Sequence, residues 1–204
     1  DMNDAINASI EAQKKVQVMT LDQREKIISN IRKKTRANAE ILANMGVNET
    51  GMGNVGDKIL KHLLTADKTP GTEVITTTAW SGDRGLTLVE MGPFGVIGAI
   101  TPATNPSETV ICNSIGMLAG GNTVVFNPHP NAKKTTIYTI NMINEASLEA
   151  GGPDNIACTV EKPTLDSSAV MMKHKDIPLL VATGGPGVVT AVLSSGKRGI
   201  GAGA

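Results

Sequence analysis

The stretch from Gly92 to Ala132 constrains the fold most, because it alternates short apolar runs with turns and a helical segment. It runs as a strand, a proline-containing turn, a helix, a second strand and a second proline-containing turn. Polar residues follow the two predicted strands, at Thr101, Thr104, Asn105, Asn127 and His129. Because ligands bind at the carboxyl ends of strands in open parallel sheets, this stretch predicts a ligand site.

The alternation continues to the end of the chain. Apolar runs predict strands at 95–100, 123–126, 156–160, 179–182 and 198–201, and periodicity predicts helices at 107–118, 133–149, 165–174 and 186–194. Short strands that are apolar on both faces and separated by helices are typical of a parallel sheet covered on both sides. Residues 92–204 are therefore expected to form an α/β domain, a Rossmann-like doubly wound parallel sheet.

Residues 1–72 show helical periodicity instead. Thr20 and Gln23 have the spacing of a capping box, in which each side chain bonds the other residue's backbone N–H. The helix that follows is expected to end at Gly46, since glycine favours helix C-termini. The apolar stripes are narrow, so this helical region is expected to pack on the α/β domain as an attached layer rather than to form a core.

Residues 73–91 change to an extended pattern. Strands are expected at 74–80 and 86–91, joined by the glycine-containing turn from Ser81 to Gly85. Leu86 and Leu88 alternate with Thr87, as expected for a strand with one buried face. This β-hairpin could pack at the edge of its own domain or against a second subunit, and the pattern does not decide between the two.

Composition excludes several classes of function. Lys and Arg together number 19, as do Asp and Glu, so the formal charge is zero and no basic surface for nucleic acid or anionic lipid is expected. Aromatic residues make up 2%, which argues against base stacking. No apolar run approaches the roughly 18 residues of a membrane span, and the N-terminus lacks the pattern of a signal peptide.

Cysteine and histidine usage indicates an intracellular protein without a metal site. The two cysteines, Cys112 and Cys158, and the three histidines match no disulfide or zinc-ligand spacing. A reducing, cytoplasmic location is therefore expected. Cys112 is predicted to be a small buried apolar residue on a helix, and Cys158 lies in a predicted buried strand. Neither thiol is expected to be a nucleophile.

Two turns are candidates for binding a nucleotide. The turn from Thr183 to Gly187 follows a buried strand and opens a helix, so its backbone could approach an anion such as a pyrophosphate. The alternative is a tight turn with no ligand. Asn127 ends the second strand, where dinucleotide folds read the adenosine ribose, and His129 follows between two prolines. For His129 the alternative is a solvated loop histidine.

Asn105 is the candidate for a catalytic role. It lies directly before a predicted helix, so its side chain could cap that helix or shape the turn with Pro106. Alternatively, its side-chain N–H groups could point into the cleft and stabilise a developing oxyanion. The local pattern alone favours the turn.

The chain resembles the CoA-acylating aldehyde dehydrogenases of bacterial propanediol and ethanolamine utilisation in four segments, GPFGVIGAITPATNP, AGGNTVVFNPHPNAKKT, LLVATGGPGVV and KRGIGAGA. The resemblance covers essentially the whole chain, in order and spacing. It implies an NAD-binding domain in which Asn105 is the oxyanion-stabilising residue. It also implies cofactor contacts from Thr101, Pro102, Asn127, His129, Thr183, Gly184, Gly185 and Val188.

The chain departs from the hydrolytic members of this superfamily at two positions. Asn127 stands where they usually have Lys, so recognition of the adenosine ribose must differ and the preference for NAD over NADP is open. Ala202 stands where they have the Glu that activates the deacylating water. Loss of such a general base costs about 10²–10⁴-fold in rate, so transfer of the acyl group to a thiol is favoured.

The nucleophilic Cys of the family is expected beyond Ala204, so the resemblance implies a cofactor-binding portion whose catalytic domain is absent from this chain. The full-length protein is expected to convert a short-chain aldehyde, CoA and NAD⁺ to acyl-CoA and NADH through a Cys thioester. A cytoplasmic homo-oligomer is expected. A location in a bacterial microcompartment, with shell or cargo proteins as partners, is an implication of the family alone.

Two other functions stay open at this point. The first is a non-catalytic nucleotide-binding module, which the missing nucleophile favours and the Asn105 loop does not. The second is a reductase of the same superfamily that acts on an acyl phosphate, since it too could dispense with the water-activating Glu.

Overall fold

The core of the molecule is a five-stranded parallel sheet. A computed structural model describes residues 1–203. The strands lie in the order β5-β4-β3-β6-β7. Their bounds are Val96–Thr101 for β3, Thr123–Pro128 for β4, Ala157–Thr159 for β5, Leu179–Thr183 for β6 and Arg198–Ala202 for β7. The predicted Rossmann-like parallel sheet is therefore confirmed; residue 204, the last of the predicted domain, lies outside the described part.

Seven helices surround this sheet in the described residues. They are α1 (Met2–Val16), α2 (Leu21–Thr50), α3 (Val55–Lys68), α4 (Pro106–Ala119), α5 (Lys133–Glu149), α6 (Leu165–Lys173) and α7 (Pro186–Leu193). The four helices after β3 begin and end within one residue of their predicted bounds. Local periodicity therefore determines them well.

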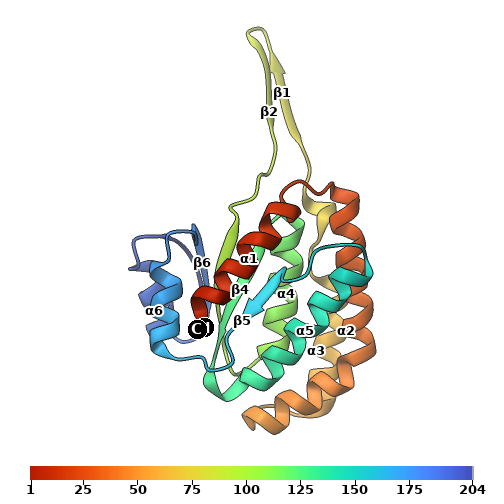
Figure 1. Ribbon diagram of the computed structural model, residues 1–204. Coiled ribbons are helices and arrows are strands. Elements are labelled where there is room, and N and C mark those ends of the chain that lie inside the picture. Colours follow the sequence, from red (N-terminus) through yellow and green to blue (C-terminus); the bar gives the residue numbers. More distant parts are fainter. Residues whose placement is uncertain (204) are drawn as a thin grey trace.

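The two faces of the sheet bury separate apolar clusters. Val124 and Phe126 of β4 pack with side chains of α2, α4 and α5, whereas Val125 between them packs with side chains of α1, α6 and α7. This alternation follows from the strand period of two residues, which sends successive side chains to opposite faces. Figure 1 shows α1 along one side of the sheet and α2, α3 and α5 gathered together on the other.

The long helix α2 takes part in this core more fully than its narrow stripe predicted. Ile27, Ile28 and Ile31 are fully buried in the same cluster as the sheet residues. The capping box at its start is confirmed, with Gln23 N–H donating to Thr20 Oγ1 at 3.2 Å and Thr20 N–H donating to Gln23 Oε1 at 2.9 Å. The helical region therefore contributes to the core through α2.

The predicted end of α2 at Gly46 is wrong. The helix continues to Thr50, and Gly51 ends it in a left-handed conformation with φ of +67°. Gly46 is buried inside the helix, where an added Cβ would lie 3.7 Å from Cδ of Lys58. A glycine within a helix costs only about 1 kcal/mol, and here the packing of α3 on α2 outweighs that cost.

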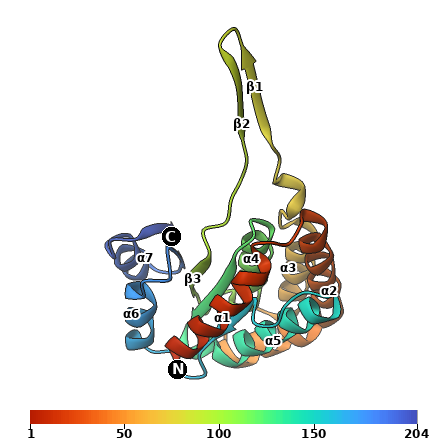
Figure 2. The ribbon, with the colours of Figure 1, turned by 45° about the horizontal axis from the view of Figure 1, so that its top comes forward.

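The predicted β-hairpin forms a separate two-stranded sheet, β1 (Thr78–Gly82) and β2 (Gly85–Val89). Figure 2 shows it projecting away from the body of the molecule, and every residue of both strands is exposed. It does not pack at the edge of its own domain, so that alternative is wrong. Its first strand begins later than predicted because residues 72–74 form a 3₁₀ turn, in which Glu73 Oε1 accepts the backbone N–H of Gly71 at 2.8 Å.

Gly98 in the central strand β3 provides a test of this packing. A Cβ there would lie 2.9 Å from Leu180 Cδ2, 3.0 Å from Met171 Cγ and 3.1 Å from Ile177 Cγ2. We expect Gly98→Ala to lower the free energy of unfolding by about 1–3 kcal/mol, as overpacking does. The control is Gly116→Ala in α4, where nothing lies within 4 Å of the new Cβ. It should raise stability by about 0.5–1 kcal/mol. Urea unfolding measures both, and an unchanged midpoint for Gly98→Ala would contradict the packing described.

Candidate functional site

A cavity of about 620 Å³ opens at the carboxyl ends of β3, β4 and β6. All eight residues expected to contact a cofactor line it: Thr101, Pro102, Asn127, His129, Thr183, Gly184, Gly185 and Val188. Ala202 from the end of β7 also lines this cavity. The structure therefore brings together every residue of the predicted binding set, from three separate turns.

Strand register places these residues at one edge. Thr101 pairs with Pro128 of β4, and Thr183 of β6 pairs with Ala202 of β7. Backbone N–H of His129 donates to Thr101 O at 3.1 Å, which continues the β3–β4 ladder into the turn. β4 and β6 flank β3 on opposite sides, so the order in which the chain adds strands to the sheet reverses at β3. Ligands bind at such a reversal in open α/β sheets.

The cavity wall is uncharged and mainly apolar, and its polar groups are hydroxyls, backbone groups, an amide and an imidazole. Among the described residues that line it, none is Asp, Glu, Lys or Arg. The Thr101 hydroxyl is buried and has no hydrogen-bond partner within residues 1–203. Gly185 precedes α7 without a side-chain cap, and Pro186 at the first helical position has no N–H. The N–H of Val188 donates to Gly185 O at 3.1 Å, so within residues 1–203 the N–H of Gly187 is the donor left for an anion at this helix start. The apolar lining suits the rings of a nucleotide, and this N–H and the hydroxyls suit its pyrophosphate and sugars.

Asn127 has a structural task as well as a place in the cavity. It is 5% exposed; its Nδ2 donates to Ser168 Oγ at 2.8 Å and its Oδ1 accepts from Ser167 Oγ at 2.6 Å. These bonds fix the start of α6 at the end of β4. One N–H of the amide is left for a ligand, so a role in reading the ribose stays a hypothesis.

His129 has a fixed ring orientation. Its Nδ1 accepts the backbone N–H of Asn131 at 3.1 Å, so in the neutral ring the proton lies on Nε2. The side chain is exposed and lines the cavity. It can offer Nε2–H to a ligand.

Asn105 lies in a neighbouring pocket of about 350 Å³, which shares Thr183 with the larger cavity. It occupies the N-cap position of α4, yet its side chain makes no capping hydrogen bond. Instead its Oδ1 accepts from Lys61 Nζ at 3.2 Å. The interpretation of Asn105 as the side-chain cap of this helix is therefore wrong.

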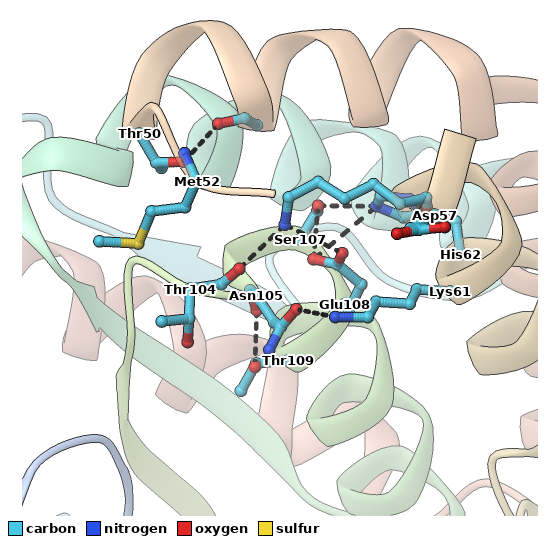
Figure 3. Close-up of polar contacts among 12 residues, drawn as sticks. Thr50, Met52, Asp57, Lys61, His62, Thr104, Asn105, Ser107, Glu108 and Thr109 are labelled. Carbon is cyan, nitrogen blue, oxygen red and sulfur yellow. Dashed lines mark hydrogen bonds and ion pairs between the residues drawn. The ribbon is translucent and has the colours of Figure 1, made fainter. Parts of the chain in front are cut away.

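Behind Asn105 lies a buried polar network that the sequence analysis missed (Figure 3). Lys58 Nζ donates to Thr104 O at 2.9 Å and lies 3.5 Å from Glu108 Oε1. His62 is fully buried, and its Nε2 lies 2.7 Å from Ser107 Oγ. Lys58 and His62 are four residues apart, which places them on one face of α3. The four-residue spacing could have indicated from the sequence that the two side chains lie together. The position of Glu108 opposite them follows only from the fold.

The protonation of His62 follows from its burial. Its Nδ1 lies 2.6 Å from Lys58 O, which can only accept, so Nδ1 carries the proton and Nε2 accepts from Ser107. Burial lowers the pKa of His62, and this effect exceeds the opposing attraction of Glu108. The ring is therefore neutral, and Lys58 is the cation that faces Glu108.

The two cysteines differ from each other. Cys112 is exposed, and the prediction that it is buried is wrong: the buried stripe of α4 includes Ile111 and Ile115, and residue 112 falls on the other face. It lines the pocket beside Asn105. Cys158 is buried as predicted, and burial raises the pKa of its thiol to about 12. A thiol with that pKa is protonated and inert.

Within residues 1–203, no three His, Cys, Asp or Glu side chains come together in an arrangement that could hold a metal ion. No helix of the same range combines the length and apolar character that crossing a bilayer requires.

The neutral state of His62 makes stability depend on pH. The unfolded chain binds a proton near pH 6.5, whereas the lowered pKa keeps folded His62 neutral there. Its contribution is therefore present above about pH 6.5 and is lost as pH falls. Between pH 7.5 and 5.5 we expect the wild type to lose more free energy of unfolding than His62→Gln. His129→Gln, at an exposed position, should behave as the wild type; equal pH slopes for His62→Gln and the wild type would contradict the assignment.

Comparisons with known proteins show the family of the chain. The family model "Aldehyde dehydrogenase family" matches residues 1–201. The propanal dehydrogenase (CoA-propanoylating) of Salmonella typhimurium is 46% identical over 203 residues, which are 100% of this chain and 44% of that protein. The chain thus spans about half the length of such relatives.

Solved structures give the same result. A propionaldehyde dehydrogenase from the fucose utilisation bacterial microcompartment of Clostridium phytofermentans is 77% identical with a TM-score of 0.98, over 100% of this chain and 47% of that one. The Rhodopseudomonas palustris propionaldehyde dehydrogenase with bound propionyl-CoA is 49% identical with a TM-score of 0.97. The match covers 100% of this chain and 45% of the Rhodopseudomonas chain. The chain belongs to the aldehyde dehydrogenase family.

Proposed function

We propose that the chain is the cofactor-binding half of an NAD-dependent, CoA-acylating aldehyde dehydrogenase that acts on a short aldehyde such as propionaldehyde. One observation carries the proposal: the uncharged nucleotide-sized cavity and the pocket that Asn105 lines share Thr183. In this proposal residues 92–204 hold the cofactor, residues 1–72 support them and residues 73–91 contact a second copy. The nucleophilic Cys comes from the further part that the relatives possess.

The cavity residues would contact different parts of the cofactor. The turn at Gly184 and Gly185 presents the N-terminal end of α7 to the pyrophosphate. His129 and Asn127 lie at the far wall, where N–H donors can meet the adenosine ribose. NAD, when bound, supplies the hydride acceptor. Because no carboxylate lines the cavity within the described residues, nothing there repels the 2′-phosphate of NADP, and both cofactors should bind.

Asn105 stabilises the charge that develops on the aldehyde oxygen. Its Nδ2 lies on the side of the amide away from Lys61 (Figure 3). A preorganised donor of this kind acts where water is excluded, and it costs no reorganisation when the charge forms. The residue therefore serves attack on the aldehyde and, later, attack on the thioester.

Ala202 supports acyl transfer to CoA over hydrolysis. It lies on the cavity wall beside Thr183, at the position where hydrolytic relatives are expected to have a water-activating Glu. A methyl group accepts no proton, so water at this place gains no general base. A thiol such as CoA is a better nucleophile without that help. The structure of a relative with bound propionyl-CoA is in line with this exit.

The test uses the full-length protein, meaning this chain joined to the further part that its relatives possess. We expect Asn105→Ala to lower turnover of propionaldehyde, CoA and NAD⁺ by roughly 10²–10³-fold, as loss of one oxyanion donor does. Asn105→Asp, which keeps the shape and removes the N–H donors, should be as slow. Formation of NADH measures both. Turnover at the wild-type rate would leave Asn105 as a turn residue only.

The same assay decides between the proposal and its two rivals. A non-catalytic module would bind NAD⁺ but form no NADH from any aldehyde. An acyl-phosphate reductase would consume NADH with propionyl phosphate and not with propionyl-CoA. The proposed enzyme consumes NADH with propionyl-CoA and releases free CoA.

The hairpin β1–β2 supports the proposal of a homo-oligomer. Trp80, Leu86 and Leu88 are 57%, 65% and 60% exposed, on a two-stranded sheet that packs on no other strand of the described chain. Such a hairpin is only marginally stable alone in water, so a partner surface is expected to cover it. A second copy of the protein is the partner we propose.

Light scattering tests the hairpin contact in the full-length protein. Leu88→Asp places a charge on the proposed interface and should lower the molar mass of the assembly. The control is Asp83→Asn in the turn at the tip of the hairpin, which should leave the mass unchanged. An unchanged mass for Leu88→Asp would exclude the hairpin as the contact.

We propose that the protein is located in the cytoplasm, inside a bacterial microcompartment. A relative with 77% identity comes from a bacterial microcompartment, which supports a cytoplasmic protein enclosed in such a compartment beside its shell and cargo proteins. An aldehyde intermediate would be retained there. Co-purification of the full-length protein with intact compartments would support the location, and its recovery in the free fraction alone would exclude it.

A further inference from the structure

The backbone around Asn105 is held from two sides. Thr109 donates to Asn105 O through both its backbone N–H, at 3.1 Å, and its hydroxyl, at 2.7 Å. The carbonyl of the preceding residue, Thr104, accepts from Lys58 Nζ at 2.9 Å. Rotation of the Asn105 side chain is therefore the degree of freedom that remains at this position.

Lys61 fixes that rotation. Its Nζ lies 3.2 Å from Asn105 Oδ1, and it makes the one hydrogen bond to the Asn105 side chain within residues 1–203. An ammonium group can donate but cannot accept, so the amide oxygen must face Lys61 and Nδ2 must face the opposite way. Figure 3 shows this arrangement, with Nδ2 turned away from Lys61.

The Asn105 side chain has a second favourable orientation, which its contact with Lys61 prevents. Asn is among the residues that most favour the N-cap position, where the side-chain oxygen accepts an N–H from the first turn of the helix. Asn105 occupies that position in α4 without making such a bond. If the oxygen turned to the helix, Nδ2 would turn with it and would no longer face away from Lys61. Lys61 holds the oxygen out of the capping orientation.

The position of Lys61 follows from the buried network below it. Lys58 is one turn earlier on α3 and is 3% exposed, close to Glu108 of α4. This pair fixes α3 against α4, and residues three apart on a helix lie on the same face. Lys61 therefore reaches the start of α4 at the level of Asn105, while its own side chain stays at the surface.

We propose that Lys61 is a positioning residue for the oxyanion donor: it aligns the Asn105 amide and, through its charge, strengthens the N–H donors of that amide. The proposal rests on the proposed function, in which Asn105 binds the developing oxyanion. Hydrogen bonds to charged groups are roughly twice as strong as neutral ones, so the alignment is stable although Lys61 is exposed.

The experiment compares Lys61→Met and Lys61→Arg in the full-length protein with propionaldehyde, CoA and NAD⁺. Lys61→Met keeps the length of the chain and removes its charge and donors, so we expect kcat to fall about tenfold, the value of roughly one charged hydrogen bond. The KM for the aldehyde should stay within about twofold. Lys61→Arg restores the donor and should recover most of kcat.

Two further measurements separate positioning from a structural role. The thermal midpoint of Lys61→Met should equal that of the wild type, because the freed amide can cap α4. In an Asn105→Ala background, Lys61→Met should cause no further loss of kcat, since its effect passes through the amide. The control Lys68→Met, at the exposed end of the same helix, should leave kcat unchanged.

Each contrary result has a distinct meaning. If Lys61→Met is as fast as the wild type while Asn105→Ala is slow, the positioning role is wrong and the proposed function stands. Additive losses in the double variant, or a fall in thermal midpoint that accounts for the lost activity, would also overturn the role. If Asn105→Ala is itself as fast as the wild type, both the role and the proposed function are wrong.

Discussion

The parallel pairing of β3 with β4 on one side and β6 on the other is the constraint on which the rest of the structure depends. Ile97 pairs with Val124 across one ladder and with Leu179 across the other, so the three strands end at the same level. Their following turns must then diverge, because each leads to a helix on a face of the sheet. The space between the diverging turns is the 620 Å³ cavity.

The same arrangement fixes how far the cavity lies from Asn105. Thr101, at the end of β3, lines the cavity, and Asn105 follows only four residues later at the start of α4. Thr183 lines both the cavity and the pocket of Asn105. The central strand therefore sets the distance between the cavity and the Asn105 amide. Under the proposed function, a bound nucleotide and the oxyanion donor meet without a large rearrangement.

The part of the fold that depends on local pattern was predictable from the sequence, and the part that depends on distant contacts was not. The strands and helices after Gly92 follow hydrophobic periodicity, and the cavity residues follow from their place at strand ends. The end of α2 was mispredicted at Gly46 because a glycine ends a helix only where packing does not favour its continuation. Cys112 lies on the exposed face of α4, about 100° of helical rotation from buried Ile111. The apolar residues around it in the sequence therefore led to the wrong prediction of burial.

The missed network shows what the first 72 residues contribute. A buried Lys58 opposite a buried Glu108 gains little net stability, because removing both charges from water costs about as much as their attraction returns. The pair gives a fixed geometry instead: it joins α3 to α4 and holds the carbonyl of Thr104. Two lysines on one face of α3 contact the chain at the candidate catalytic residue. Lys58 donates to the backbone carbonyl of Thr104, and Lys61 donates to the side-chain amide of Asn105. The N-terminal helices therefore support the candidate site as well as forming part of the core.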